Sequence, residues 1–244
     1  MSDLTLSLLE RKPSRRAKQW QARVAAITDL LVAQYGTPSL GNFRNPVKAI
    51  FYIVLSARTT ESLYKEAHKQ LFERFPTLQE IANAPLAKLR ACVAVAGLGK
   101  KRAEQIKRIA GKLLSDFGKR STARLRGLSA MEAYSYLRTL SGVGPKSALC
   151  IMMYSLGFDV FPVDTHAHRM LCRIGLMPSG RKHYHAQIML PAFVPPNYSN
   201  KLHVALILHG RRICKSRLPH CSSCELSIFC KYATKHFVAA HSIP

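Results

Sequence analysis

The stretch LSGVGPKSALCIMMYSLGFDVFPVDTHAHR, residues 140–169, decides how the rest of this chain is interpreted. Two glycines, Gly142 and Gly144, stand one residue apart near its start. Glycine permits a positive φ and leaves the backbone N–H groups open to an anion. Pro145 is typical of the first position of a helix, whose dipole adds partial positive charge there. Residues 142–146 are therefore a candidate phosphate-binding turn, although the glycines alone would favour an ordinary turn between helices.

Lys146 follows in the first turn of that helix. The helix dipole disfavours a positive charge at this end, which favours the neutral amine that a nucleophile needs. The alternative interpretation is a lysine that binds a DNA phosphate, and the two roles are compatible in part.

Asp164 lies 18 residues after Lys146, inside the apolar run VFPVDTH. A carboxylate in such surroundings is costly to bury without a role. Aspartate is also a favoured N-cap, and the following THAHRMLCRIG has the pattern of a helix. A cap holds the side chain in place, so capping is compatible with catalysis. Asp164, His166 and His168 alternate, but residues two apart on a helix do not face each other, so we expect no metal there.

The charge of the chain predicts a polyanionic partner. Lys and Arg number 37 against 13 Asp and Glu, which gives a formal net charge of +24, while 48% of the residues are hydrophobic. Nucleic acid is the leading candidate and an anionic membrane surface is the alternative. No apolar run reaches the ~20 residues of a membrane span. Seven cysteines without a secretory signal argue against a disulfide framework and for a reducing compartment.

Four cysteines near the C-terminus follow the pattern C-x6-C-x2-C-x5-C. Four thiolates so close in sequence need a metal or a cluster to fold around, although the spacing alone does not separate zinc from iron–sulfur. The basic loop between the first two is expected to contact phosphate through Lys215 and Arg217. The four are Cys214, Cys221, Cys224 and Cys230.

Apolar residues recur at helical spacing along most of the chain, and strand signals are scarce, so the predicted fold is all-α. A second glycine turn, Gly97-Leu98-Gly99, resembles the one at 142–144. Residues 1–20 are predicted to form a basic flexible arm. Helices are expected over residues 22–35, 47–57, 86–95, 102–117, 131–140, 147–158, 165–174 and 203–212, and in a segment that runs through residue 71.

LSGVGPKSA, the aspartate of VDTH and the cysteine spacing together resemble the helix–hairpin–helix DNA glycosylases of the endonuclease III type, over about residues 22–232. The resemblance implies two helical lobes with a DNA-binding cleft between them. One is a six-helix barrel with the helix–hairpin–helix, residues 48–158. The other combines residues 21–47 and 159–244 and carries a 4Fe–4S cluster on the four cysteines, in preference to zinc.

The same resemblance implies a base-excision glycosylase with lyase activity on double-stranded DNA that contains a damaged base or an abasic site. Lys146 would attack C1′ of a flipped nucleotide and form a Schiff base, and Asp164 would stabilise the developing positive charge. Oxidised pyrimidines are the expected lesions. Alternatives are the same fold acting on mismatched thymine, uracil or an oxidised purine, and a non-enzymatic DNA-binding module. We expect a monomer, in the cytoplasm with the nucleoid if bacterial and in the nucleus if eukaryotic.

The resemblance also implies DNA contacts for individual residues of this chain. Arg58 and Leu98 would fill the gap that the flipped nucleotide leaves. The best-known bacterial members carry Gln where this chain has Arg58, which leaves the opposite-base preference open. Arg138 stands where some pyrimidine-specific relatives have an acid, which leaves the lesion open. The other expected DNA contacts are Gly142, Gly144, His166, Lys215 and Arg217, and the expected pocket residues are Ser56, Glu61 and Arg138.

Overall fold

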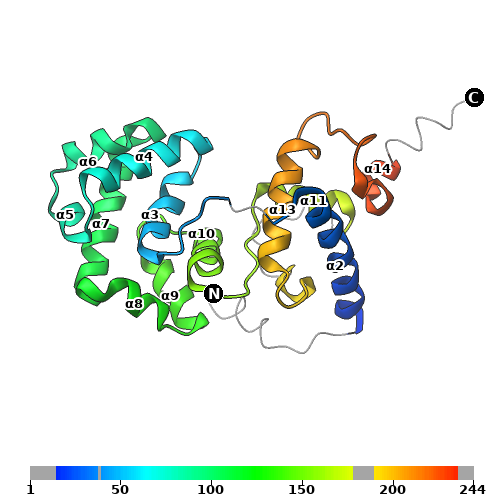
Figure 1. The fold of residues 1–244 in the computed structure, drawn as a ribbon, viewed down its shortest axis with the longest axis horizontal. Coiled ribbons are helices and arrows are strands. Elements are labelled where there is room, and N and C mark those ends of the chain that lie inside the picture. Colours follow the sequence, from blue (N-terminus) through cyan, green and yellow to red (C-terminus); the bar gives the residue numbers. More distant parts are fainter. Residues whose placement is uncertain (1–14, 38–39, 178–189, 236–244) are drawn as a thin grey trace, which may run out of the picture. The chain divides into compact units, whose positions relative to one another are not determined.

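The computed structural model describes residues 15–37, 40–177 and 190–235 (Figure 1). Within these ranges every regular element is a helix and none is a strand, which confirms the all-α prediction. The chain divides into two compact units, residues 41–158 on the one hand and residues 1–40 with 159–244 on the other. None of the helices described is long and apolar enough to cross a membrane.

The unit of residues 41–158 is built around α3, Pro46–Ser56. Nine of the eleven residues of α3 are buried, and α4, α8 and α10 pack around it (Figure 1). A helix that is apolar all round is stable only in such a central position. The other helices are α4 (Glu61–Arg74), α5 (Leu78–Asn83), α6 (Leu86–Val93), α7 (Gly99–Phe117), α8 (Ser121–Arg126), α9 (Ala130–Thr139) and α10 (Pro145–Ile151), with η1 (Ala94–Ala96), η2 (Gly118–Arg120) and the π-helical η3 (Met152–Leu156).

Side-chain caps set where several of these helices begin. The Asn45 side chain accepts hydrogen bonds from the backbone N–H groups of Val47 and Lys48, at 2.9 and 3.2 Å, and Pro46 then occupies the first helical position. Capping boxes start α5, with Thr77 and Glu80, and α9, with Ser129 and Glu132. These two capping boxes fix the residues at which α5 and α9 begin.

The second unit contains α2 (Arg15–Tyr35), α11 (Thr165–Ile174), η4 (Leu190–Phe193), α13 (Ser199–Arg212), η5 (Glu225–Phe229) and α14 (Lys231–Ala233). The helix α13 packs against both α2 and α11, as Figure 1 shows. Their facing sides form one apolar core, and the half-buried Cys214 and Cys224 lie against it. The cysteine segment is therefore attached to the core that α2 and α11 share.

The basic arm predicted for residues 1–20 needs a correction. The helix α2 begins at Arg15, so residues 15–20 are helical, and residues 1–14 lie outside the described part of the chain. The Trp20 ring meets the Phe193 ring edge to face at 6.1 Å, and the Gln21 amide donates to the Ala192 carbonyl. These contacts come from a segment about 170 residues further along, which local sequence patterns do not reveal.

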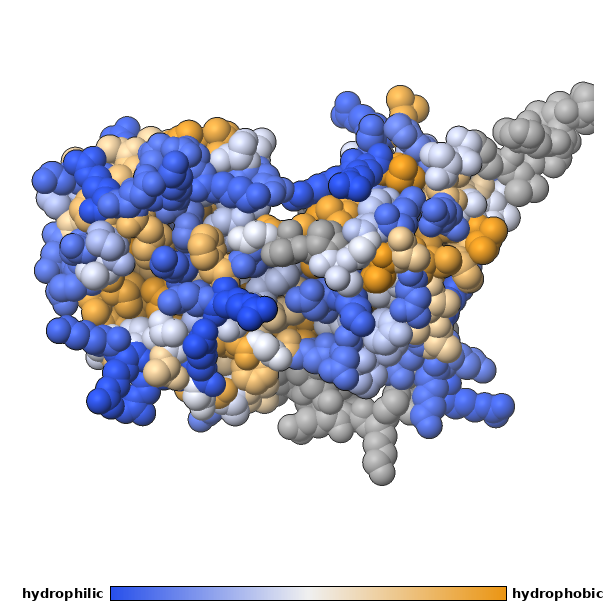
Figure 2. All heavy atoms as spheres, in the orientation of Figure 1, coloured by the Kyte–Doolittle hydropathy of each residue, from blue (hydrophilic) through white to orange (hydrophobic). Residues whose placement is uncertain are grey.

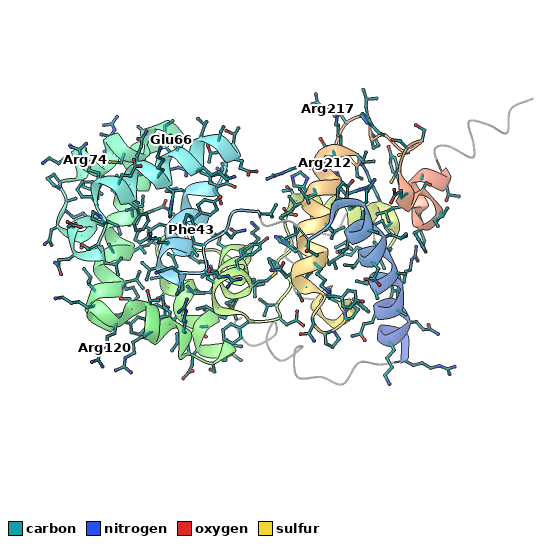
Figure 3. All side chains as sticks on the ribbon, viewed as in Figure 1. Phe43, Glu66, Arg74, Arg120, Arg212 and Arg217 are labelled. Atoms are coloured by element: carbon teal, nitrogen blue, oxygen red, sulfur yellow. The ribbon has the colours of Figure 1, made fainter. Side chains whose placement is uncertain are left out.

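Residues 41–47 belong to the unit of residues 41–158, whereas the sequence analysis placed them with the cysteine lobe. The Ser155 hydroxyl donates to the Phe43 carbonyl at 2.7 Å. The Phe43 ring, labelled in Figure 3, stacks on His68 with centroids 4.4 Å apart and meets Tyr52 edge to face at 5.2 Å. The aromatic contacts of Phe43 explain why the unit begins at Gly41.

His68 gives this unit a pH-dependent stability. The pKa of its imidazole is lowered to about 4, chiefly by burial; the hydrogen bond to the Lys48 carbonyl opposes this shift, and the Lys48 charge adds to it. An unfolded histidine titrates near 6.5, so the unfolded state binds more protons between pH 6.5 and 4. The free energy of unfolding should therefore fall as the pH drops through this range, by on the order of 3 kcal/mol from His68 alone.

His68→Phe keeps a ring between Phe43 and Phe72 and removes the titration. Urea unfolding followed by circular dichroism at pH 7 and pH 4 should show a smaller acid loss in this variant than in the wild type. An equal loss in both proteins would mean that His68 does not carry this pH dependence.

Candidate active site and nucleic-acid interface

The glycine turn at 142–144 has the shape that its sequence requires, but only one glycine uses a positive φ. Gly142 has φ +82°, and a Cβ there would stand 2.6 Å from the Gln105 amide nitrogen of α7. Gly144 has φ −82° and is extended, which any residue can adopt, and it serves as the N-cap of α10. The positive φ of Gly142 strains any other residue there, and a Cβ would also require the Gln105 side chain to move.

Arg138 braces this turn from the preceding helix. Its guanidinium donates from Nη1 to the Val143 carbonyl at 2.7 Å, across the turn. Its expected role in a substrate pocket stays a prediction, because the observed hydrogen bond is to the protein backbone. Lys146 is the second residue of α10 and is half-buried, directly behind the turn.

Asp164 is the N-cap of α11. Its Oδ1 accepts a hydrogen bond from the Ala167 N–H at 2.7 Å, and the side chain is half-buried between the buried Val163 and Ala167. The capping role that the sequence indicated is thus present. Because the cap fixes χ1, the carboxylate presents one defined orientation at the helix start.

His166, on the first turn of α11, packs inside its own unit. Its Nδ1 lies 3.1 Å from Nη2 of Arg169, and a Cβ on Gly210 would come within 2.8 Å of it. Burial lowers the pKa of His166, while the Asp164 carboxylate opposes this effect. Of its two expected roles, DNA contact and packing near Asp164, the second is the one that these contacts favour.

The four spaced cysteines lie on the segment that follows α13, and all four are half-buried. The pKa of Cys224 is raised to about 11, chiefly by burial; a backbone hydrogen bond at Leu226 opposes the rise, and Cys214, Cys230 and Cys221 add to it. Burial and the same neighbours, Cys230 and Cys214, also raise the pKa of Cys221. Among the residues described, no three His, Cys, Asp or Glu side chains converge closely enough to hold a single metal ion. The four sulfurs nevertheless form one electrostatic group, and a bound cationic centre would favour their deprotonation.

Two residues that the sequence analysis did not single out contact the sulfurs. Arg173 donates from Nη1 to Sγ of Cys214, 3.2 Å away. His209, fully buried, places Nε2 3.3 Å from Sγ of Cys224, while its Nδ1 lies 2.9 Å from the Tyr35 hydroxyl. Outer contacts of this kind orient the ligands of metal sites. Both residues sit in predicted helices without a local motif, so only the fold could identify them.

Two arginines of α11 hold the basic loop after Cys214 through hydrogen bonds to its backbone carbonyls. Arg173 donates to the Lys215 carbonyl at 2.7 Å and to the Ser216 carbonyl at 3.0 Å. Arg169 donates to the Cys214 carbonyl from both Nε and Nη2, at 3.0 and 2.8 Å. The helix that Asp164 caps therefore also fixes the backbone of the loop. Arg217 stands at the outer end of this loop in Figure 3, and hydrophilic residues gather there in Figure 2.

The two expected gap-filling residues share an uncommon backbone. Arg58 has φ +56° and Leu98 has φ +51°, and the Leu98 side chain is 61% exposed. Large apolar side chains are seldom held in the left-handed region, so an exposed leucine there indicates a constrained position. The expected pocket residues beside Arg58 have contacts of their own. Ser56 donates to the Ile53 carbonyl at 2.8 Å, and Glu61 pairs with Lys65 at 2.6 Å.

Comparison with known proteins assigns the family. Residues 51–191 match the family described as HhH-GPD superfamily base excision DNA repair protein, and the chain belongs to it. A protein of Arabidopsis thaliana named as a DNA glycosylase is 31% identical over 72% of this chain, which spans 57% of that protein. Endonuclease III of Sulfolobus acidocaldarius is 29% identical over 79% of this chain and 84% of its own length.

Solved structures agree with this assignment. The structure of a non-covalent endonuclease III–DNA complex superimposes with a TM-score of 0.76 at 26% identity, over 88% of this chain and 97% of that one. A trapped covalent endonuclease III–DNA intermediate matches equally well. A thermostable thymine-DNA glycosylase matches with a TM-score of 0.74 at 22% identity, which shows a shared fold. The chain thus has the fold of an endonuclease III-type base excision repair protein.

Proposed function

We propose that this protein is a DNA glycosylase with lyase activity that removes damaged bases, foremost oxidised pyrimidines, from double-stranded DNA. The observation that carries the proposal is the pair of chemically suited residues at two helix starts. Lys146 follows the glycine turn at the start of α10, and Asp164 is locked as the cap of α11. The likeness to endonuclease III in complexes with DNA supports the same assignment.

The proposed chemistry begins when neutral Lys146 attacks C1′ of a flipped nucleotide. A bond forms between Nζ and C1′, the glycosidic C1′–N bond breaks, and the base leaves with its electron pair and takes up a proton. Asp164 stabilises the positive charge that develops on the sugar and accepts the proton that the amine loses. The nitrogen lone pair then forms the C=N bond of the Schiff base while the C1′–O4′ bond breaks, and O4′ keeps that electron pair and takes up a proton.

Strand cleavage follows from that Schiff base. Loss of a C2′ proton and departure of the 3′ phosphate oxygen with the electron pair of the C3′–O bond break the strand on the 3′ side. Water then hydrolyses the imine and returns the amine of Lys146. A glycosylase without the lysine would stop after release of the base, so the lyase step depends on this residue.

A panel of duplexes with one lesion each tests the proposed reaction. An oxidised pyrimidine, uracil, a G·T mismatch, an oxidised purine and an abasic site would be incubated with the protein, with and without borohydride. We expect base release and a trapped covalent adduct with the oxidised pyrimidine, and an adduct with the abasic site. Release of mismatched thymine or uracil alone would assign the same fold to the alternative lesions. No turnover and no adduct on any duplex would leave a DNA-binding module.

We propose that Cys214, Cys221, Cys224 and Cys230 would hold a 4Fe–4S cluster, which their spacing in the sequence and the electrostatic influence of the other three thiols on Cys224 support. Arg173 donates to Sγ of Cys214, and Nε2 of His209 lies beside Sγ of Cys224; outer contacts of this kind orient the ligands of metal sites. Such a cluster would supply rigidity to a segment that otherwise has only short 3₁₀ and helical turns. The catalytic steps above do not pass through it.

Iron content tests this cofactor. Purified protein should be yellow-brown and contain iron and sulfide, and Cys221→Ser should lose both because one of four ligands is removed. Cys172→Ala is the matched control, since Cys172 lies in the same unit outside the spacing pattern and should leave the iron content unchanged. Zinc without iron in the wild type would contradict the assignment.

The basic loop is proposed to contact DNA phosphates. Lys215→Ala and Arg217→Ala should weaken binding to all duplexes and each lower the slope of log affinity against log salt by ~1. Fluorescence anisotropy on an undamaged duplex at several salt concentrations measures both effects. Arg120→Ala, which removes an exposed arginine of the other unit, is the control and should keep the wild-type slope. Unchanged slopes for both loop variants would remove the loop from the DNA interface.

A further inference from the structure

Arg102 joins the two segments that carry Arg58 and Leu98. Its backbone N–H donates to the Leu98 carbonyl at 3.0 Å, as part of the start of α7. Its side chain reaches across to the end of α3, where Nη1 donates to the Leu55 carbonyl and Nη2 donates to the Ala57 carbonyl at 2.6 Å. One residue therefore connects two loops that lie more than 40 residues apart in the sequence.

The acceptors explain how a charge can be buried at this position. Arg102 is 3% exposed, and burial lowers the pKa of its guanidinium, yet arginine stays protonated in proteins. No carboxylate lies within ion-pair distance of Arg102 in the described part of the chain. The Leu55 carbonyl lies in the last turn of α3 and Ala57 is the C-cap of that helix. Carbonyls at a helix C-terminus lack helical partners and carry the negative end of the helix dipole. These two accept hydrogen bonds from both terminal nitrogens of the guanidinium in place of an acid, while its buried Nε has no hydrogen-bond partner among the described residues.

Burial of a cation without an acid carries a desolvation cost, and the two backbone hydrogen bonds of Arg102 are the contacts that offset it. Arg58 follows Ala57 directly, and Leu98 is the N-cap of α7. Both residues have a left-handed backbone conformation. Such conformations persist only where neighbouring contacts fix them. The planar fork of arginine sets the direction of both hydrogen bonds at once, which a lysine cannot do.

We infer that Arg102 is a positioning residue that holds Arg58 and Leu98 at a fixed spacing, so that both can enter the gap left by a flipped nucleotide. The inference rests on the proposed function, because it assumes that the gap has to be filled. It adds a residue that touches neither DNA nor the reacting atoms. Its effect should therefore appear where a duplex has to be opened and be absent where no opposite strand exists.

Two substrates separate these cases. The first is a duplex with an oxidised pyrimidine, and the second is a single-stranded oligonucleotide with an abasic site, which Lys146 can cleave without flipping a base. Arg102→Met should lower single-turnover cleavage of the duplex by about 100-fold, as a displaced positioning group does. Cleavage of the single strand should stay within about twofold of the wild type. Arg102→Lys, which keeps the charge and lacks the fork, should show an intermediate loss on the duplex and serves where the Met variant does not fold.

A control variant and a double variant complete the test. Arg126→Met removes another arginine of the same unit that donates to a backbone carbonyl, that of Arg44, and should leave both rates unchanged. Leu98→Ala combined with Arg102→Met should cost less than the sum of the single variants, because both act through one element. Equal losses on the duplex and the single strand, or additive losses, would overturn the inference. A wild type that cleaves neither substrate would instead overturn the proposed function.

Discussion

Lys146→Gln should abolish the covalent adduct that borohydride traps during turnover. Glutamine keeps the polarity and roughly the length of lysine but has no nucleophilic amine, so neither the bond to C1′ nor the Schiff base can form. Single-turnover cleavage of the oxidised-pyrimidine duplex should fall on the order of 10⁴-fold or more, as it does when a nucleophile is removed. Binding of the duplex, measured by fluorescence anisotropy, should weaken only slightly, because one positive charge is lost.

The chain offers a matched control for this variant. Lys100 is the second residue of α7, after the turn Gly97-Leu98-Gly99, as Lys146 is the second residue of α10. Lys100→Gln makes the same chemical change at the same helical position and should still be trapped at the wild-type rate. Trapping of Lys146→Gln at the wild-type rate would show that another amine is the nucleophile, and the proposed chemistry would be wrong.

Much of the helical pattern was available from the sequence because long amphipathic segments and their punctuation are local. The helix predicted over residues 165–174 is confirmed as α11, Thr165–Ile174, with Gly175 in the left-handed region after it. The two helices of six residues, α5 and α8, were not predicted, since such short segments hold too few turns for a periodicity. The capping box of Thr77 and Glu80 was the signal that could have located α5.

The supporting contacts of the candidate site were beyond a reading of the sequence. Lys146, Asp164 and the four cysteines stand in recognisable motifs, and their roles stay proposals. Arg102, Arg173 and His209 have no motif, and their side chains contact groups that are 15 to 174 residues away in the chain. Which carbonyl or sulfur such a side chain meets depends on how whole helices pack, and no local pattern encodes that.

Asp164 allows its catalytic and structural roles to be measured apart. Asparagine can still accept the Ala167 N–H as an N-cap, so Asp164→Asn should keep the stability of the wild type. It removes the negative charge that stabilises the developing positive charge on the sugar, and base release should slow by on the order of 100-fold or more. Asp164→Ala loses the cap as well, and its free energy of unfolding should fall by ~1 kcal/mol while base release is slowed to a similar extent.

Single-turnover base release from the oxidised-pyrimidine duplex, together with urea unfolding, measures both effects for each variant. Asp159→Asn is the control for the loss of one acid from the same segment. Asp159 accepts a hydrogen bond from the Asn197 N–H and has no role in the proposed chemistry, so this variant should release the base at the wild-type rate. If Asp164→Asn released the base at the wild-type rate and only Asp164→Ala were slow, Asp164 would act only as a helix cap. Another group would then have to stabilise the charge on the sugar.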